Sequence, residues 1–209
     1  MKHFILAVTY TWWRGDALPA LSPLPGLRCE RLTDSGLLAE LHGLAPDKIN
    51  ARLADANTAY VAYLHDEPAA YGWSGANHVG VANLIWPIPS GSRGLWNFVT
   101  LPAFRGRGIY PLLLQAILRM EETVVEKFWI GHRIDNIASQ RGIEKAGFQL
   151  LNHVVLTPEE KIRLAPVNFP ERAYGDPQGM HYGFVDLLPA EMTPFDFGNL
   201  SDDELELPE

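Results

Sequence analysis

The run Phe98-Val-Thr-Leu-Pro102-Ala-Phe-Arg105-Gly106-Arg107-Gly108-Ile109-Tyr110 decides the fold of this chain, within a segment that extends from 96 to 148. It predicts a strand, a tight glycine turn and an apolar helix over about 109–124. Two glycines at alternate positions expose the backbone N–H groups of the turn, because no Cβ stands in the way. The positive end of the helix dipole points at the same place. The run therefore predicts an anion site, most naturally for a phosphate.

The residues that follow predict a second strand and a second helix. The apolar run 128–132 has the length of a strand, and the order strand, helix, strand predicts a parallel right-handed crossover. Asp135 or Asn136 can cap the next helix, which we expect over 137–145, and Gly147 would end it in a left-handed conformation. We expect a further strand over 148–156 that pairs with a later one around 180–185.

The N-terminal part of the chain has the alternating patterns of strands and the capping residues of short helices. A tight turn over 65–68 predicts a hairpin, and the segment after it is expected to extend the same sheet. We expect strands over 4–13, 27–32, 60–64, 69–74 and 79–86, and short helices after Asp34 and near Pro46.

The length and the charge distribution predict one domain with two appendages. A chain of 209 residues with 47% hydrophobic content can bury a single full core. Eight of the 25 acidic residues lie in 186–209, which leaves 17 acids against 17 bases and a balanced remainder. We therefore predict an N-terminal extension over 1–26 with a possible extra strand and a Pro-rich connection, a main domain over 27–185, and an acidic, flexible tail over 186–209.

Composition also indicates which partners to expect. The basic residues form no dense stripe, so we expect no nucleic-acid partner. No apolar run approaches the roughly 20 residues of a membrane span, and no targeting segment is visible, so we expect no membrane association. The lone Cys29 suits a reducing compartment, and the cytoplasm is the expected location. We expect no metal site.

Two motifs together resemble those of a known family. The stretch Thr100–Ile109 followed by Leu113-Leu114 resembles the acyl-CoA loop of GNAT-type N-acyltransferases, whose pattern is (Q/R)-x-x-G-x-(G/A). Asn136-Ile-Ala-Ser139, followed by Glu144-Lys145-Ala-Gly147-Phe148, resembles the second signature, N-x-x-S and then E-K-x-G-F. A nucleotide P-loop does not fit, because no G-K-(S/T) follows the glycines. The resemblance implies a single α/β domain with a mixed, mostly antiparallel sheet and helices on both faces.

The resemblance also implies an activity and a set of binding residues. The activity is transfer of an acetyl or other acyl group from acetyl-CoA to a primary amine, of a small molecule or a peptide, by direct attack in a ternary complex. By this resemblance, the backbone of Phe98, Val99 and Thr100 contacts the pantetheine arm of coenzyme A. The pyrophosphate is bound by the loop residues Arg105, Gly106, Arg107, Gly108, Ile109 and Tyr110. Asn136 and Ser139 contact the arm or the phosphates.

Each of these side chains also has a plainer interpretation. Asn136 can serve only as a helix cap, Arg105 and Arg107 can be solvated loop residues, and Ser139 can be an ordinary first-turn residue. The three tryptophans Trp73, Trp86 and Trp96 can line an acceptor site, although core packing is the favoured interpretation for them.

The catalytic groups depart from the family pattern at three positions. Many relatives have a Glu where this chain has Gly131 and a Tyr acid where it has Ile143, and Tyr110 replaces a small residue. His132 is the best local candidate for the base, because an imidazole titrates near neutral pH. Further candidates are His78, Asp135, His181 and Tyr182, and proton transfer through water needs no dedicated residue.

These departures keep other functions open. The alternative to the acyltransferase is a non-catalytic acyl-CoA-binding or sensing module, which Gly131 and Ile143 suggest, and a structural protein without a ligand is a third hypothesis. Neither the acceptor nor the oligomeric state follows from the sequence, and a homodimer is one of the open arrangements.

Overall fold

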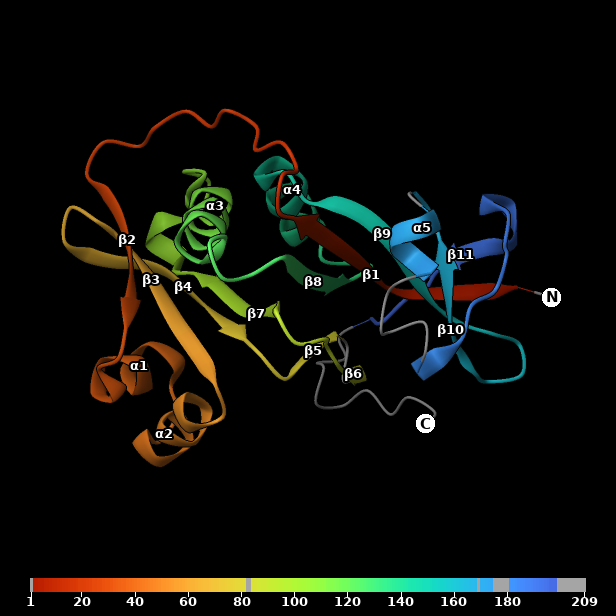
Figure 1. Ribbon diagram of the computed structural model, residues 1–209, viewed down its shortest axis with the longest axis horizontal. Coiled ribbons are helices and arrows are strands. Elements are labelled where there is room, and N and C mark those ends of the chain that lie inside the picture. Colours follow the sequence, from red (N-terminus) through yellow and green to blue (C-terminus); the bar gives the residue numbers. More distant parts are fainter. Residues whose placement is uncertain (1, 82–83, 169, 175–180, 199–209) are drawn as a thin grey trace.

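The computed structural model describes residues 2–81, 84–168, 170–174 and 181–198 (Figure 1). The strands are β1 (His3–Trp13), β2 (Leu27–Leu32), β3 (Asn57–Leu64), β4 (Glu67–Gly75), β5 (His78–Val81), β6 (Leu84–Pro87), β7 (Ser92–Thr100), β8 (Lys127–Arg133), β9 (Gln149–Leu156), β10 (Ile162–Pro166) and β11 (Met192–Pro194). The helices are α1 (Ser35–His42), α2 (Pro46–Ala54), α3 (Ile109–Glu121), α4 (Ile137–Ala146) and α5 (Pro170–Tyr174), with short 3-10 turns at Pro102–Phe104 and Pro189–Glu191.

The main sheet is mixed and mostly antiparallel, which confirms the predicted fold class. Its strand order is β10-β9-β1-β8-β7-β4-β3-β2, and β11 pairs in parallel with β1. The pair β7–β8 is parallel, as the strand-helix-strand order predicted, and β3–β4 form the predicted antiparallel hairpin. Helices α3 and α4 lie on one face of the sheet, and α1 and α2 lie on the other (Figure 1).

The strand β1 lies inside the sheet. Residues 1–26 were expected to form an extension with an extra strand, but β1 pairs with β8 on one side and with β9 on the other. The fold buries both faces of β1: Leu6 and Ala7 are fully buried on one face, and Tyr10 and Trp12 are buried on the other. Such a strand needs neighbours on both edges to bond its backbone groups.

Two strand pairings differ from the sequence prediction. Residues 79–86 were expected to extend the main sheet, but β5 and β6 pair with each other as a separate two-stranded sheet. The strand β9 was expected to pair near 180–185; it pairs instead with β10 and β1. In the described part of the expected partner, Phe184 forms a bridge to Leu164 of β10, and Met180 lies outside the described residues.

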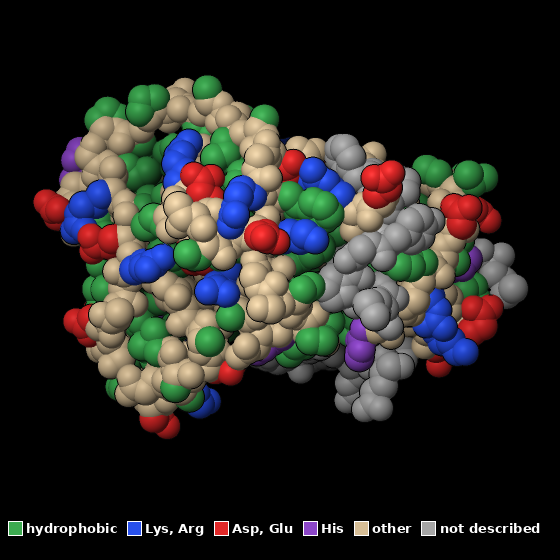
Figure 2. All heavy atoms as spheres, in the orientation of Figure 1, with side chains coloured by type: hydrophobic (Ala, Val, Ile, Leu, Met, Phe, Trp, Pro, Cys, Tyr) green, Lys and Arg blue, Asp and Glu red, His purple; other side chains and the backbone are tan. Residues whose placement is uncertain are grey.

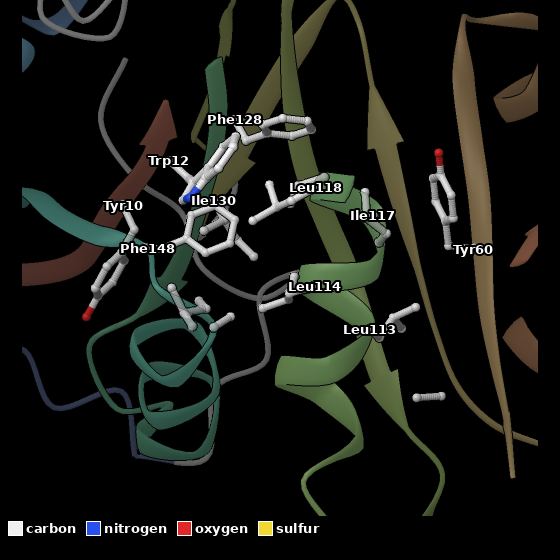
Figure 3. Packing of buried hydrophobic residues seen from close by; sticks show 14 of the residues in the cluster. Tyr10, Trp12, Tyr60, Leu113, Leu114, Ile117, Leu118, Phe128, Ile130 and Phe148 are labelled. Atoms are coloured by element: carbon white, nitrogen blue, oxygen red, sulfur yellow. The ribbon is translucent and has the colours of Figure 1, made fainter. Parts of the chain in front are cut away.

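The helix α3 packs its apolar face onto the sheet. Leu113, Leu114, Ile117 and Leu118 are fully buried, and Figure 3 shows them gathered with Trp12, Phe128 and Ile130. The helix ends at Glu121, earlier than the predicted residue 124, and Val124 is 69% exposed. The buried Glu121 carboxylate accepts a hydrogen bond from the Tyr60 hydroxyl (2.6 Å) and pairs with Arg93 (3.1 Å), so the last turn of the helix is tied to β3 and β7.

Part of the expected C-terminal tail is folded. The backbone N–H of Phe195 donates to the carbonyl of Ile5, and Phe197 is 2% exposed. The acidic residues of 186–198 are interrupted by aromatic residues that pack on β1, which net charge alone does not reveal. Residues 199–209, the remainder of the expected tail, lie outside the described residues.

Three observations bear on the expected partners and metal content. On the face seen in Figure 2, Lys and Arg side chains lie scattered among Asp and Glu side chains. None of the described helices is long and apolar enough to cross a membrane. The described residues also contain no group of three or more His, Cys, Asp or Glu side chains arranged to hold a metal ion.

Candidate active site

The strands β7 and β8 separate at the centre of the sheet. Their parallel ladder runs from Ser92–Lys127 to Leu95–Ile130 and ends at Leu95. On the edge that faces β4, β7 contains a bulge. Trp96 pairs with Trp73 and Val99 pairs with Tyr71, so the two residues 97 and 98 of β7 lie opposite the single residue 72 of β4. A bulge bends a strand and increases its twist, and β7 still pairs with β4 beyond this one. Beyond Leu95, the edge of β7 that faces β8 is open.

Two unusual backbone features build this bulge. Asn97 has a φ of 53°, a left-handed conformation that is uncommon outside glycine. The residue opposite the bulge is Gly72, where an added Cβ would lie 2.2 Å from the Phe98 ring. The glycine therefore lets the Phe98 ring lie directly on β4. Backbone strain of this kind costs free energy and is most often found at functional sites.

The glycine loop after β7 presents free backbone N–H groups. Gly106 and Gly108 have φ values of 76° and 74°, and a Cβ on either would meet nothing within 4 Å. Gly108 occupies the N-cap of α3, so no side chain of the N-cap residue bonds the first N–H groups of the helix. Within the described part of the chain, the N–H groups of 106–108 donate to no backbone carbonyl. The loop thus fits an anion: its donors are unoccupied, and the space over them is open.

Two adjoining cavities lie along the open edge of β7. The loop cavity, about 660 Å³, lies between the glycine loop, the end of β7 and α4. The splay cavity, about 590 Å³, lies where β7 and β8 separate. Both are lined by Phe98, Tyr110, Asn136 and Ser139. The two cavities therefore form one cleft with a junction at these four residues.

Most of the sequence-predicted binding residues line the loop cavity. They are Phe98, Val99, Thr100, Arg105, Gly106, Gly108, Ile109, Tyr110, Asn136 and Ser139. Arg107 is not among the lining residues; its guanidinium donates to the carbonyl of Ala103 and lies over the Phe104 ring. The Arg105 Nε donates to the carbonyl of Thr100 (3.1 Å), which ties the loop to the end of β7.

The helix α4 contributes basic residues that the sequence motifs did not assign to the site. Arg141 and Lys145 line the loop cavity with Arg105. The sequence spacing could have identified these two basic residues. Residues three and four apart share one face of a helix, and that face of α4 carries Ala138, Arg141, Gly142 and Lys145. Lys145 carries a charge beside the cavity, although its position near the helix C-terminus also complements the helix dipole.

The N-terminus of α4 is capped by Asn136. Its Oδ1 accepts a hydrogen bond from the backbone N–H of Ser139 (3.0 Å), so the capping interpretation holds for this oxygen. Gly147 ends the helix with a φ of 103°, as predicted. The cap directs the first turn of α4 toward the cleft, where Asn136 and Ser139 line both cavities.

Tyr110 fills the space between α3 and α4. Its ring centroid lies 5.5 Å from that of Phe98, and its hydroxyl lies 3.4 Å from Ser139 Oγ. A Cβ on Gly142 would lie 2.2 Å from the Tyr110 ring, so the large residue on α3 is matched by the absence of a side chain on α4. Burial raises the pKa of the Tyr110 hydroxyl, so it is protonated at neutral pH.

His132 lines the splay cavity from β8. Its side chain is buried (4% exposed) and stacks on the Tyr10 ring at 5.6 Å, while the Tyr10 hydroxyl donates to Glu144. Its Nδ1 lies 2.7 Å from the carbonyl oxygen of Arg133, which can only accept, so Nδ1 carries the proton and Nε2 carries the lone pair. Nε2 is buried without a hydrogen-bond partner among the described residues. Burial lowers the pKa of His132 and keeps it neutral.

The two departures from the family pattern have structural counterparts. A Cβ on Gly131 would lie 3.2 Å from both the Val8 carbonyl and Val81, so the β5–β6 hairpin occupies the space of a larger side chain. Ile143 is fully buried in the core beside α3. Neither position carries a group that can exchange a proton.

The remaining candidates divide between the cleft and the core. Asp135 and Trp96 line the splay cavity, and Asp135 pairs with Arg133. Trp73 and Trp86 are buried, and Trp86 packs against Tyr182. His78, His181 and Tyr182 line neither cavity.

Comparison with known proteins agrees with this geometry. The model of the acetyltransferase (GNAT) family matches residues 29–148. No curated protein matches the sequence. Among solved structures, similar folds include a GNAT-family acetyltransferase from Colwellia psychrerythraea (TM-score 0.53, 14% identity, 74% of this chain and 56% of that one). A GCN5-related N-acetyltransferase from Kribbella flavida is comparable (0.52, 14%, 71% and 56%), as is one from Sphaerobacter thermophilus (0.52, 12%, 71% and 50%). The chain thus spans about half the length of these proteins.

Proposed function

Because this chain belongs to the GNAT acetyltransferase family, we propose that it transfers an acetyl group from acetyl-CoA to a primary amine, by direct attack in a ternary complex. The observation that carries the proposal is the single cleft along the open edge of β7. It joins a loop with unoccupied N–H donors to the gap between β7 and β8. A long ligand with an anionic end and a reactive end fits such a cleft.

The loop cavity is the proposed site for the phosphates of coenzyme A. The N–H groups of 106–110 and the dipole of α3 would bind the pyrophosphate, and Arg105, Arg141 and Lys145 add positive charge. The backbone of 98–100, which β8 leaves unpaired on one edge, would bind the pantetheine arm. Asn136 and Ser139 line the same path.

The splay cavity is the proposed meeting place of thioester and amine. An alkyl amine with a pKa near 10 is about one part in a thousand neutral at pH 7, which costs about 4 kcal/mol. His132 is the proposed base, because its Nε2 has a free lone pair and the residue lines this cavity. Nε2 is buried, so the proton would reach it through a bound water or a small opening of the site. Trp96 offers an apolar wall to the acceptor, which is a small molecule or a peptide.

A second candidate function is a module that binds acyl-CoA without turnover. It is favoured by Gly131 and Ile143, because neither can move a proton and both are held by packing. Release of the thiol of coenzyme A from acetyl-CoA, measured across a panel of amines, distinguishes the two functions. Turnover with any amine excludes the binding module, and binding of coenzyme A without turnover favours it.

The glycine loop provides the sharpest test of the proposal. Gly108→Asp places bulk and negative charge over the proposed phosphate site, so we expect it to abolish both turnover and the rise in melting temperature that coenzyme A produces. Gly91→Asp is the matched control: Gly91 has a φ of 79°, an equally open Cβ position and a place just before the other end of β7. Both variants carry a strain of about 1–2 kcal/mol. Normal stabilisation of Gly108→Asp by coenzyme A would overturn the loop assignment.

A further inference from the structure

The wall of the splay cavity that Trp96 forms is backed by a charged side chain of α2. The Arg52 guanidinium lies over the Trp96 ring, with its central carbon 5.0 Å from the ring centre and 5.8 Å from the centre of the Trp73 ring. The two indole rings stack with their centres 5.7 Å apart. Trp96 lines the splay cavity and Arg52 does not. The guanidinium therefore lies one indole ring away from the cavity, on the face of the sheet that carries α1 and α2.

Arg52 lacks a carboxylate partner among the described residues. Arg28, Arg93 and Arg172 each form an ion pair with an Asp or Glu side chain. Arg52 forms none with a described residue, and its Nη1 is buried without a hydrogen-bond partner there. Burial lowers the pKa of Arg52, the direction expected for a cation with no acid beside it, but an arginine still carries its charge at neutral pH. A partly buried cation without a counter-ion is costly, so this one is suited to an anion that binds from outside.

Two neutral donors on Trp96 and its neighbour are also unoccupied. Trp73 Nε1 donates to His42 Nε2 (3.0 Å), whereas Trp96 Nε1 donates to no described residue and stays accessible. The exposed Asn97 side chain, which follows Trp96 in the cavity wall, makes no hydrogen bond within the described part of the chain either. This wall of the cavity thus offers an indole N–H and an amide N–H beside the charge of Arg52.

We propose that the acceptor is an amino acid or a similar amine that carries a carboxylate, and that Arg52 and Trp96 Nε1 bind this carboxylate. The inference rests on the proposed function, because the amine of the same molecule would lie in the splay cavity with His132. The other charged groups of that cavity are matched: Arg133 pairs with Asp135, and burial keeps His132 neutral. A carboxylate carries one charge and suits one guanidinium, whereas a phosphate carries up to two and would leave one unbalanced.

Pairs of acceptors with and without the carboxylate charge test the proposal. On the wild type we expect kcat/KM for glycine, β-alanine and the common L-amino acids to exceed that for their carboxamides by about 10- to 100-fold. On Arg52→Gln this ratio should fall about 10-fold or more, and Arg52→Lys, which keeps the charge, should retain part of it. Each ratio is taken within one variant and compared between variants, so a partial loss of folded protein and the different basicity of the amines both cancel.

Arg28→Gln is the matched control. The Arg28 guanidinium also lies over an aromatic ring, that of Tyr63 (4.1 Å), but Arg28 lines neither cavity and pairs with Glu30. We expect this variant to keep the wild-type ratio. Aminoethylphosphonate is the phosphate-like counterpart of β-alanine, and we expect it to be acetylated with the lower kcat/KM of the two.

Values of kcat/KM for the acids that do not exceed those for the carboxamides on the wild type would overturn the proposal, as would a preference for the acids that Arg52→Gln leaves intact. A higher kcat/KM for aminoethylphosphonate than for β-alanine would overturn the choice of a carboxylate. If no amine is acetylated, the proposed function fails, and melting temperatures measured with coenzyme A and saturating amino acid decide this inference. A rise with the amino acids that is absent with their carboxamides and absent on Arg52→Gln supports it, and the lack of such a rise overturns it.

Discussion

His132 illustrates how one backbone carbonyl sets the chemistry of a side chain. The Arg133 carbonyl oxygen accepts a hydrogen bond from Nδ1–H, so the ring proton stays on Nδ1 and the lone pair is on Nε2. Burial then lowers the pKa of the ring, which keeps it neutral under conditions where a free histidine is partly charged. The acidic groups Glu144 and Asp135 oppose this shift without reversing it. A neutral imidazole with a free lone pair is the form that a base requires.

Replacement of His132 should change the pH dependence of kcat/KM and the pH dependence of the free energy of unfolding. If His132 is the base, His132→Gln should lower kcat/KM about 100-fold and remove the acid limb of the pH profile, which we expect below pH 6.5. Below that pH the unfolded chain binds a proton at this residue that the folded chain excludes. Its contribution to stability is therefore complete above pH 6.5 and is lost as the pH falls toward the folded pKa.

The control for this experiment is His153→Gln. Burial lowers the pKa of His153 as well, but this residue lies on β9 and lines neither cavity. We expect it to alter the pH dependence of unfolding and to leave kcat/KM near that of the wild type. An unchanged profile for His132→Gln would exclude the imidazole as the base and would favour proton transfer through water alone.

At the scale of elements, the packing of α3 on α4 depends on one large and one absent side chain. Tyr110 on α3 projects into the space that Gly142 leaves on α4. A glycine inside a helix costs about 0.5–1 kcal/mol relative to alanine, so this helix gives up intrinsic stability to accommodate the ring. The same fit holds Tyr110 and Ser139 together at the junction of the cavities.

A double-mutant cycle measures this fit. Gly142→Ala alone should destabilise the protein by about 1–3 kcal/mol, because the new Cβ overlaps the Tyr110 ring. In a Tyr110→Ala background the same change should stabilise it by about 0.5–1 kcal/mol, since only the helix propensity remains. Denaturant unfolding gives both values. A Gly142→Ala change that stabilises both backgrounds equally would show that the two residues do not compete for space.

At the scale of the whole molecule, both ends of the described chain meet at one edge of β1. The strand β11 pairs with His3–Ile5, and Phe197 packs into the core on the face of the sheet that carries β5 and β6. The Arg133 guanidinium lies 4.2 Å from the centre of the Phe197 ring. Since Arg133 also lines the splay cavity, the C-terminal segment supports a wall of the candidate active site.

The packing of this segment predicts a large difference between two apolar residues near the C-terminus. Phe197→Ala should lower the free energy of unfolding by about 3–5 kcal/mol, because its side chain is almost fully buried. Leu188→Ala should change it by less than about 0.5 kcal/mol, because Leu188 is 69% exposed. Denaturant unfolding compares the two variants. If residues 186–198 formed a solvated tail, as their charge alone predicts, neither substitution would matter.

The sequence by itself determined the parts of this protein that depend on neighbouring residues. The glycines at 106 and 108, the cap at Asn136 and the left-handed Gly147 follow from residue type and backbone conformation. The β3–β4 hairpin and the parallel β7–β8 pair follow from short connections and chain order. Together these local features account for most of the residues that line the loop cavity.

Only the tertiary structure decided which strands became neighbours and which side chains met. An apolar strand has the same sequence pattern whether it lies at an edge or in the middle, so β1 became an inner strand only through its hydrogen bonds to β8 and β9. The contact of Tyr110 with Gly142 and Ser139 joins positions about thirty residues apart, and the neutral state of the His132 ring depends on burial. Packing between distant segments sets these features, and a local pattern carries no record of it.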